Sequence, residues 1–170
     1  MSTTTHQHAD QVVVEAVAWD APGAAALRAA QEAEMAVRYG GEDDAPAIDP
    51  ASIVVTLVAR VDGEPAATVA VRDVSGTDDG RGRGTTHPAA TGEVKRLYVD
   101  PARRGLGLAK RLMADVETAA RRVGFRRFVL ETGIEQPEAI GLYEALGYAP
   151  IEKYGDHAHE EKQRCYGKRL

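Results

Sequence analysis

The pattern of apolar and polar positions predicts a chain in which short strands alternate with helices. Strand-like apolar runs occur at residues 12–18, 52–61, 65–74, 92–99, Phe128–Leu130, 149–154 and 162–169. Helical spacing of apolar residues is clear at 107–123, weaker at 21–39 and expected at 137–146. The resulting order, β-α-β-β-β-α-β-α-β-β, favours a mixed sheet with helices on both faces over a doubly wound parallel sheet.

Turn and capping residues set the expected limits of these elements. Asp62-Gly63 is a strong hairpin signal between two of the strands. Asp20 is expected to cap the first helix, because its side chain can accept a hydrogen bond from the first turn. Gly124 and Gly147 stand where the second and third helices should end.

Composition limits the classes of protein that remain. The chain has 170 residues, of which 44% are hydrophobic and 28% charged, and this suits one globular domain. Residues 1–10 are polar and expected to be a disordered tail, so the domain would cover 11–170. No apolar run reaches the roughly 20 residues that span a bilayer, and the start does not resemble a secretory leader, so a cytoplasmic location is expected. A single cysteine, Cys165, excludes an internal disulfide and a cysteine-based zinc site.

Charge is distributed unevenly along the chain. The net charge is −5, yet residues 95–127 hold ten basic residues against three acidic ones. A basic segment in an acidic chain of pI 5.6 suggests a local anion site rather than general affinity for nucleic acid. A solvated helix face is the alternative interpretation.

A turn rich in arginine and glycine follows the strand at 92–99 and opens the strongest helix. Glycines let an anion approach the backbone, the first N–H groups of a helix are unpaired, and Arg104 adds a charged donor. The turn therefore suits a pyrophosphate. A Walker loop does not fit, since its lysine and hydroxyl residue would be misplaced, and a Rossmann turn needs a glycine where Lys110 stands. A tight turn with a solvated arginine is the alternative.

Three segments in order resemble the GNAT N-acetyltransferase superfamily, and together they cover about residues 93–150. Val99–Ala109 has the form V-x-P-x-x-R-G-x-G-x-A of the family's acetyl-CoA signature. Glu93–Val99 resembles the family's fourth strand, and Gln136–Tyr148 resembles its segment N-x-x-A-x-x-L-Y-x-x-x-G-F/Y. Gln136 stands where the family often has asparagine, which could shift a contact with the pantetheine arm.

The resemblance implies a GNAT-like α/β fold: a mixed, mostly antiparallel sheet of about six to seven strands, with helices on both faces and one splayed parallel strand pair. Acetyl-CoA would lie between the splayed strands, and no metal is implied. The pantetheine arm would contact Gln136 and pair with the backbone of Leu97, Tyr98 and Val99. The pyrophosphate would be held by Arg104 and by the N–H groups of Gly105, Leu106, Gly107, Leu108 and Ala109.

The resemblance also implies direct transfer of the acetyl group to an amine, which needs a base for the ammonium and an acid for the departing thiolate. Glu93 would be the base, usually through water, and partial burial is expected to raise its pKa. Glu131 or water alone is the alternative base, and an exposed strand-end charge is the alternative interpretation of Glu93. Tyr143 falls on the family's tyrosine near the sulfur and would donate a proton; otherwise it is a core aromatic.

An acetyl-CoA-dependent N-acetyltransferase is the leading expectation, and a non-catalytic acyl-CoA-binding or sensing module of the same fold is the alternative. The acceptor would be a small-molecule or peptide amine, nucleic-acid and membrane partners are not expected, and a homodimer is left open. Acidic loops would steer a cationic acceptor or merely keep the chain soluble. These acidic residues are Glu42, Asp43, Asp44, Asp156, Glu160 and Glu161.

Overall fold

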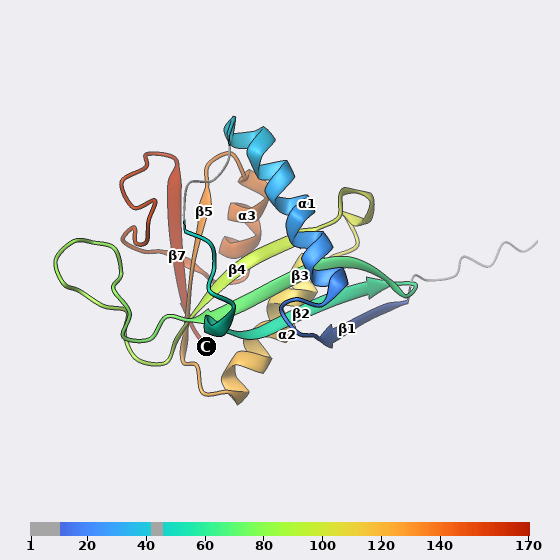
Figure 1. Cartoon of the computed structure of the whole chain (residues 1–170), viewed down its shortest axis with the longest axis horizontal. Helices are drawn as coiled ribbons and strands as arrows, with labels where there is room; N and C mark the ends of the chain where they lie inside the picture. The colour runs from blue at the N-terminus through green and yellow to red at the C-terminus, as the bar shows by residue number, and fades with distance from the viewer. Residues whose placement is uncertain (1–10, 42–45) are drawn as a thin grey trace, which may run out of the picture.

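Seven strands form one sheet in the order β1-β2-β3-β4-β5-β7-β6 in a computed structural model that describes residues 11–41 and 46–170 (Figure 1). The strands are β1 (Val12–Ala16), β2 (Ile53–Val61), β3 (Glu64–Asp73), β4 (Thr91–Val99), β5 (Arg127–Gly133), β6 (Ala149–Pro150) and β7 (Gln163–Arg169). The helices are α1 (Pro22–Tyr39), α2 (Leu108–Arg122) and α3 (Pro137–Ala145), and short 3-10 turns cover Pro50–Ser52 and Pro101–Arg103. The predicted tail 1–10 and the acidic residues 42–44 lie outside the described residues.

The predicted order of elements is confirmed, with local corrections. Asp62 and Gly63 have φ of 51° and 87°, as the predicted hairpin turn between β2 and β3 requires. Asp20 does not cap α1. Ala21 holds the N-cap position without a side-chain hydrogen bond, because the helix begins one residue later with a proline, whose fixed φ suits a first turn. β5 is longer than predicted, and β6 is only two residues long.

The two faces of the sheet carry different helices. α1 covers one face, and α2 and α3 cover the other (Figure 1). Side chains alternate along the strands, so that Leu57 packs in the larger core beneath α2 while Val58 packs beneath α1. The larger core includes Leu112, Met113, Val116, Phe128 and Leu130, all at most 1% exposed. Within the described part of the chain, no helix has the length and apolar character needed to cross a membrane.

β4 and β5 are the parallel pair of the described sheet, and they separate after a short stretch. The paired positions are Thr91↔Arg127, Gly92↔Phe128 and Glu93↔Val129. Beyond them, the pairing of β4 with β3 has an irregular register between Lys95 and Tyr98, and Arg96 there has φ 59°. Such a bulge bends the strand locally. The predicted splayed pair is therefore confirmed.

Gly92 lies where these two strands are still paired. A Cβ atom at this position would lie 2.9 Å from Phe128 Cε1 and 2.9 Å from Val71 Cγ1, both in the larger core. The absence of a side chain therefore lets β4 pack closely against this core, directly before Glu93.

Gly92→Ala should lower the free energy of unfolding by about 1–3 kcal/mol, because the added methyl group overpacks a filled core. Urea unfolding followed by circular dichroism measures the change. Gly141→Ala in α3 is the matched control: a Cβ atom there meets nothing within 4 Å, so stability should stay the same or rise slightly. Equal stability of the parent and Gly92→Ala would contradict the tight packing described above.

Candidate active site

The turn before α2 presents backbone N–H groups that no side chain of the described residues caps. Gly105 and Gly107 have φ of 85° and 73°, in the left-handed region that favours glycine, and α2 begins at Leu108. The first N–H groups of a helix and its positive dipole end favour an anion. Leu106, between the two glycines, is 44% exposed. The N–H groups that the sequence assigns to pyrophosphate therefore lie together at one accessible turn.

Arg104 extends from this turn toward α1. Its Nε donates to the Val99 carbonyl at 3.2 Å, and its Nη2 forms an ion pair of 2.6 Å with Glu34. The guanidinium also lies 5.8 Å from the centre of the Tyr98 ring. Burial would raise the pKa of Glu34, but hydrogen bonds from Arg104 and Arg38 lower it overall. A carboxylate thus engages the guanidinium that the sequence assigns to pyrophosphate.

The C-terminal half of α1 makes contacts on both sides of the gap between β4 and β5. Gln31 Nε2 donates to the carbonyl of Leu97 in β4 at 2.9 Å. Tyr39, at the end of the helix, accepts a hydrogen bond of 3.2 Å on its hydroxyl from Gln136 Nε2, just beyond β5. Leu97 and Gln136, two of the residues predicted to contact pantetheine, are thus both bonded to α1.

Glu93 places a carboxylate in the interior, on the α1 side of the sheet. Its side chain is 1% exposed; Oε2 accepts from Arg72 Nε, and Oε1 accepts from the Tyr154 hydroxyl at 2.9 Å and lies 3.2 Å from Lys95 Nζ. Burial would raise the pKa of Glu93, but the charges of Lys95 and Arg72 hold it below the ordinary value. The expectation of a raised pKa is therefore wrong, because it considered burial without these two cations. Glu93 is ionised at neutral pH.

Lys95 links the two strands beyond the point where their backbones separate. Its Nζ forms ion pairs with Glu93 and with Glu131 of β5. Burial would lower the pKa of Lys95, but the two carboxylates raise it overall. Glu131 also accepts a hydrogen bond of 2.5 Å from Gln163 Nε2, and its side chain is 20% exposed. We call Arg72, Glu93, Lys95 and Glu131 the charged row; of its two carboxylates, Glu131 is the one that solvent reaches.

Four buried side-chain oxygen atoms have no hydrogen-bond partner among the described residues: the hydroxyls of Thr56 and Thr132 and two amide oxygens on the α1 side, which are acceptors only. The two amide oxygens are Oε1 of Gln31 and Oε1 of Gln163. The Nε2 atom of each amide already donates to an oxygen, Leu97 O in one case and the Glu131 carboxylate in the other, which fixes the orientation of both amides. Because buried acceptors in native proteins normally have a donor, these amide oxygens suit a ligand that brings N–H groups.

Tyr143 lies on the face of the sheet opposite Glu93, in the larger core beneath α2. It is 6% exposed, and its ring centroid lies 5.8 Å from that of Tyr148 and 6.4 Å from that of Tyr166. Burial raises the pKa of Tyr143, so the phenol is protonated at neutral pH. The hydroxyls of Tyr148 and Tyr166 bond to carboxylates, whereas that of Tyr143 has no partner in residues 11–41 and 46–170. Its hydroxyl is therefore free to donate.

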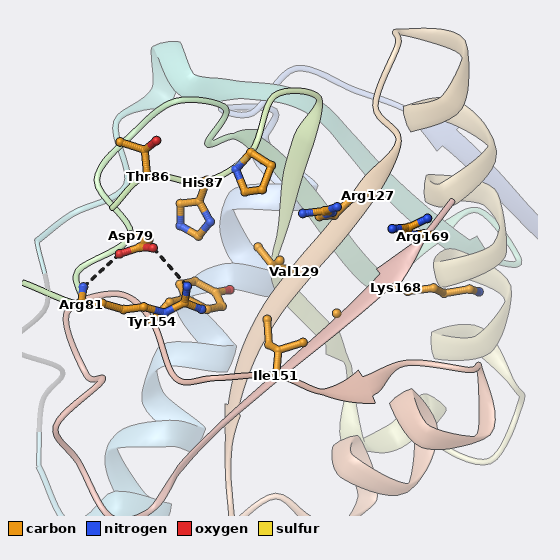
Figure 2. A pocket seen from close by; sticks show the side chains of 12 residues that line it. Asp79, Arg81, Thr86, His87, Arg127, Val129, Ile151, Tyr154, Lys168 and Arg169 are labelled. Carbon is orange, nitrogen blue, oxygen red and sulfur yellow. Dashed lines mark hydrogen bonds and ion pairs between the residues drawn. The ribbon is translucent and has the colours of Figure 1, made fainter. Parts of the chain in front are cut away.

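A hollow of about 330 Å³ lies beside β5 and β7 (Figure 2). Tyr154 forms part of its wall and bonds to Glu93 through its hydroxyl, so the hollow borders the charged row. His87 packs edge-on against Tyr154 with ring centroids 5.0 Å apart, and burial lowers the pKa of His87. None of the residues predicted to contact acetyl-CoA lines this hollow.

The sequence predicts Glu93 and Tyr143 as site residues but does not indicate the partners of Glu93. Lys95 could have been found, because two residues apart on one strand place both side chains on the same face. Arg72 and Tyr154 lie 21 and 61 residues from Glu93, and no local pattern connects them to it. Among the described residues, no three His, Cys, Asp or Glu side chains form a group that could hold a metal ion.

Comparison with known proteins finds a matching family model and several acetyltransferase relatives. A family model for the acetyltransferase (GNAT) family matches residues 17–148. The chain is 39% identical over 66 residues to an IAA acetyltransferase of Azospirillum brasilense and 47% identical over 60 residues to the uncharacterized N-acetyltransferase YjgM of Escherichia coli K12. These matches cover 39% and 35% of this chain and 43% and 36% of the relatives, so the chain spans less than half of either relative's length.

Solved structures share the fold over nearly the whole chain. A protein of Klebsiella pneumoniae, provisionally described as an acyl-CoA N-acyltransferase, is 26% identical with a TM-score of 0.74 and coverage of 94% of this chain and 97% of that one. A GNAT acetyltransferase of Elizabethkingia anophelis, solved with acetyl-CoA bound, is 14% identical with a TM-score of 0.64 and coverage of 94% and 98%. The second likeness shows a common fold.

Glu93→Gln should lower the free energy of unfolding by about 1.5–3 kcal/mol at pH 7, because it removes the charge-assisted bonds of the buried carboxylate to Arg72 and Lys95, while Lys95 keeps Glu131. Since the folded state lowers the pKa of Glu93, this stabilisation is present above pH 4.5, the ordinary value, and is lost as the pH falls further. Denaturant unfolding of both proteins between pH 3 and pH 8 measures it.

Glu152→Gln is the control, because the Glu152 side chain is 72% exposed and lies 3.7 Å from Arg81. It should change stability little at any pH. A stability difference between the parent and Glu93→Gln that stays constant from pH 8 to pH 3 would contradict an ionised, paired Glu93.

Proposed function

The chain belongs to the GNAT acetyltransferase family, and we propose that it transfers the acetyl group of acetyl-CoA directly to a primary amine. The observation that carries this proposal is the gap between β4 and β5, which opens beside the glycine turn at the start of α2. The gap leaves backbone groups of β4 and β5 unpaired, and these could bond to the extended pantetheine arm of acetyl-CoA. The turn offers N–H groups to its pyrophosphate. A cytoplasmic location and a homodimer stay expectations from the sequence, and the proposed acetyl transfer does not require either.

The residues at the gap suit acetyl-CoA as the acetyl donor. Gly105 and Gly107 allow phosphate oxygens to approach the backbone closely, and Arg104 would exchange its Glu34 partner for a phosphate. The carbonyl of Leu97 and the side chain of Gln136, both now bonded to α1, would serve the pantetheine arm. The acetyl-CoA found in the Elizabethkingia anophelis structure supports this use of the shared fold.

The α1 side of the gap suits an amine as the acceptor. Gln31 and Gln163 each present a buried oxygen without a donor, and Glu131 presents a partly exposed carboxylate. An alkyl ammonium carries N–H donors and a positive charge, the chemistry that such oxygens and a carboxylate accept. Asp156, with the acidic residues of the loop 155–161, adds negative charge near the chain's surface and would steer a cation. The acceptor class we propose is therefore a small-molecule or peptide amine.

The acceptor must lose a proton before attack, because an alkyl ammonium has a pKa near 10. Glu93 is 1% exposed and both its oxygens are engaged, so as a base it would need a water to relay the proton. Both oxygens of Glu131 are also engaged, by Lys95 and Gln163, but its side chain is 20% exposed, so an acceptor or a solvent water can reach it. We favour Glu131 as the carboxylate that receives the amine, with Glu93 holding Lys95 in place, and the role of Glu93 as base stays a prediction.

In the proposed step the nitrogen lone pair forms a C–N bond with the acetyl carbon, the C–S bond breaks, and the sulfur leaves as a thiolate. One ammonium proton passes to the carboxylate before attack and from there to solvent, and the second passes to solvent water as the amide forms, while a proton from solvent restores the Tyr143 hydroxyl after it has donated to the thiolate. Tyr143 would donate a proton to the thiolate from the opposite face of the sheet, since its hydroxyl is protonated and has no partner in the described residues. Burial raises the pKa of Cys165 to about 11, so that thiol is a poor nucleophile, which supports direct transfer over an acyl-cysteine intermediate.

A panel of primary amines with acetyl-CoA tests this function through release of free thiol. We expect turnover on at least one amine, with a mass increase of one acetyl group on that amine. Binding of acetyl-CoA in calorimetry with no thiol release on any amine would favour the alternative, a non-catalytic acyl-CoA sensor of the same fold. Absence of binding would contradict both functions.

Tyr143→Phe should lower kcat by about 10²-fold or more while acetyl-CoA affinity stays within a few-fold, because only the proton donor is lost. Tyr166→Phe is the matched control, since that ring packs in the same cluster but its hydroxyl bonds to Glu144. It should keep kcat within about twofold. If both variants turn over like the parent, Tyr143 is a core aromatic and not an acid.

A further inference from the structure

The hollow beside β5 and β7 is lined by apolar side chains along its floor and, at one end, by two arginines that have no acidic partner in the described residues. Val129, Gly167 and Ile151 line its apolar part, and His87 and Tyr154 supply flat ring surfaces (Figure 2). Gly167 has no side chain, and Ile151 packs over β7 at this point: a Cβ atom on Gly167 would lie 3.1 Å from Ile151 Cγ2. A volume of about 330 Å³ lies near the lower end of the range for small-molecule sites.

Arg127 and Arg169 define the positive end. They lie directly opposite each other in the β5–β7 register, and both line the hollow (Figure 2). Like charges directly across a strand pair destabilise a sheet. Neither guanidinium has a hydrogen bond or ion pair with any residue in 11–41 or 46–170, so the repulsion between them is not offset within the described chain.

The other cations that line the hollow are already neutralised. Arg81 Nη1 pairs with the buried carboxylate of Asp79 at 3.1 Å, and Lys168 Nζ pairs with Glu117 at 2.8 Å. The positive charge available to a ligand is therefore confined to Arg127 and Arg169, at the end of the hollow away from Asp79 (Figure 2).

We propose that this hollow binds a small organic oxyanion, a carboxylate or phosphate on a compact apolar body, with the oxyanion between Arg127 and Arg169. Two planar guanidinium groups offer paired N–H donors that match the oxygens of either anion. The apolar body lies over Val129 and against the Tyr154 ring, where it displaces water from apolar surface. The hollow shares the Tyr154 wall with the charged row, but none of its lining residues is predicted to contact acetyl-CoA, so its existence does not depend on the proposed function.

Isothermal titration of the full chain with benzoate, phenyl phosphate and benzyl alcohol tests the proposal. We expect benzoate or phenyl phosphate to bind and benzyl alcohol, which has the ring without the anion, to bind at least tenfold more weakly. Arg127→Gln and Arg169→Gln should each weaken anion binding by about tenfold or more, as loss of a charge-assisted hydrogen bond predicts. Whichever anion binds more tightly identifies carboxylate or phosphate as the natural group.

Arg122→Gln is the matched control, because Arg122 is an exposed arginine of α2, on the other face of the sheet, and also has no partner among the described residues. It should leave anion binding unchanged, and all three variants should keep the parent's acetyl-CoA affinity. The proposal is overturned if neither anion binds, if inorganic phosphate binds as tightly as phenyl phosphate, or if Arg127→Gln and Arg169→Gln bind like Arg122→Gln.

Discussion

The carboxylate of Glu93 is a buried negative charge at the point where β4 and β5 stop pairing, and much of the site depends on how it is neutralised. An ion removed from water costs several kcal/mol unless its partners are well placed. Three groups stabilise the Glu93 carboxylate: the cations Arg72 of β3 and Lys95 of β4, and the hydroxyl of Tyr154, which donates a hydrogen bond. Three separate segments are thereby fixed around one group, and Lys95 carries the connection on to Glu131 across the opening gap.

This arrangement gives the gap two chemically different sides. On the α1 side are the charged row and the amide oxygens of Gln31 and Gln163, which suit a cationic acceptor. On the α2 side are the glycine turn and the core that holds Tyr143, which suit phosphate and sulfur. α1 bonds to β4 through Gln31 and to Gln136 just beyond β5, and its Glu34 holds Arg104, so arrival of the acetyl donor would exchange contacts that α1 now makes. In the proposed function, the strand divergence would therefore link donor binding to the wall of the acceptor site.

Much of the fold follows from local sequence patterns, and much of the site does not. Asp62-Gly63 sets a hairpin by its own backbone preference, and the apolar spacing at 107–123 is enough to place α2. The glycine turn and Tyr143 fall in segments whose local motifs are distinctive. The pKa of Glu93 could not be predicted in this way, because it depends on Arg72 and on Tyr154, a residue 61 positions away in the chain. Asp20 fails as a cap for a local reason, because the helix begins at the proline two residues later and Ala21 takes the cap position.

The account rests on Glu93 being ionised by its two cations, and a ¹³C NMR titration of its side-chain carboxyl measures this directly. The Glu93→Gln spectrum assigns the signal, and the pH is lowered from 8 until the protein unfolds. The account predicts a carboxylate shift that is constant down to pH 4.5 and a midpoint below that ordinary value. A midpoint above 4.5 would mean that burial outweighs Arg72 and Lys95, and it would contradict the account while restoring Glu93 as a titrating base.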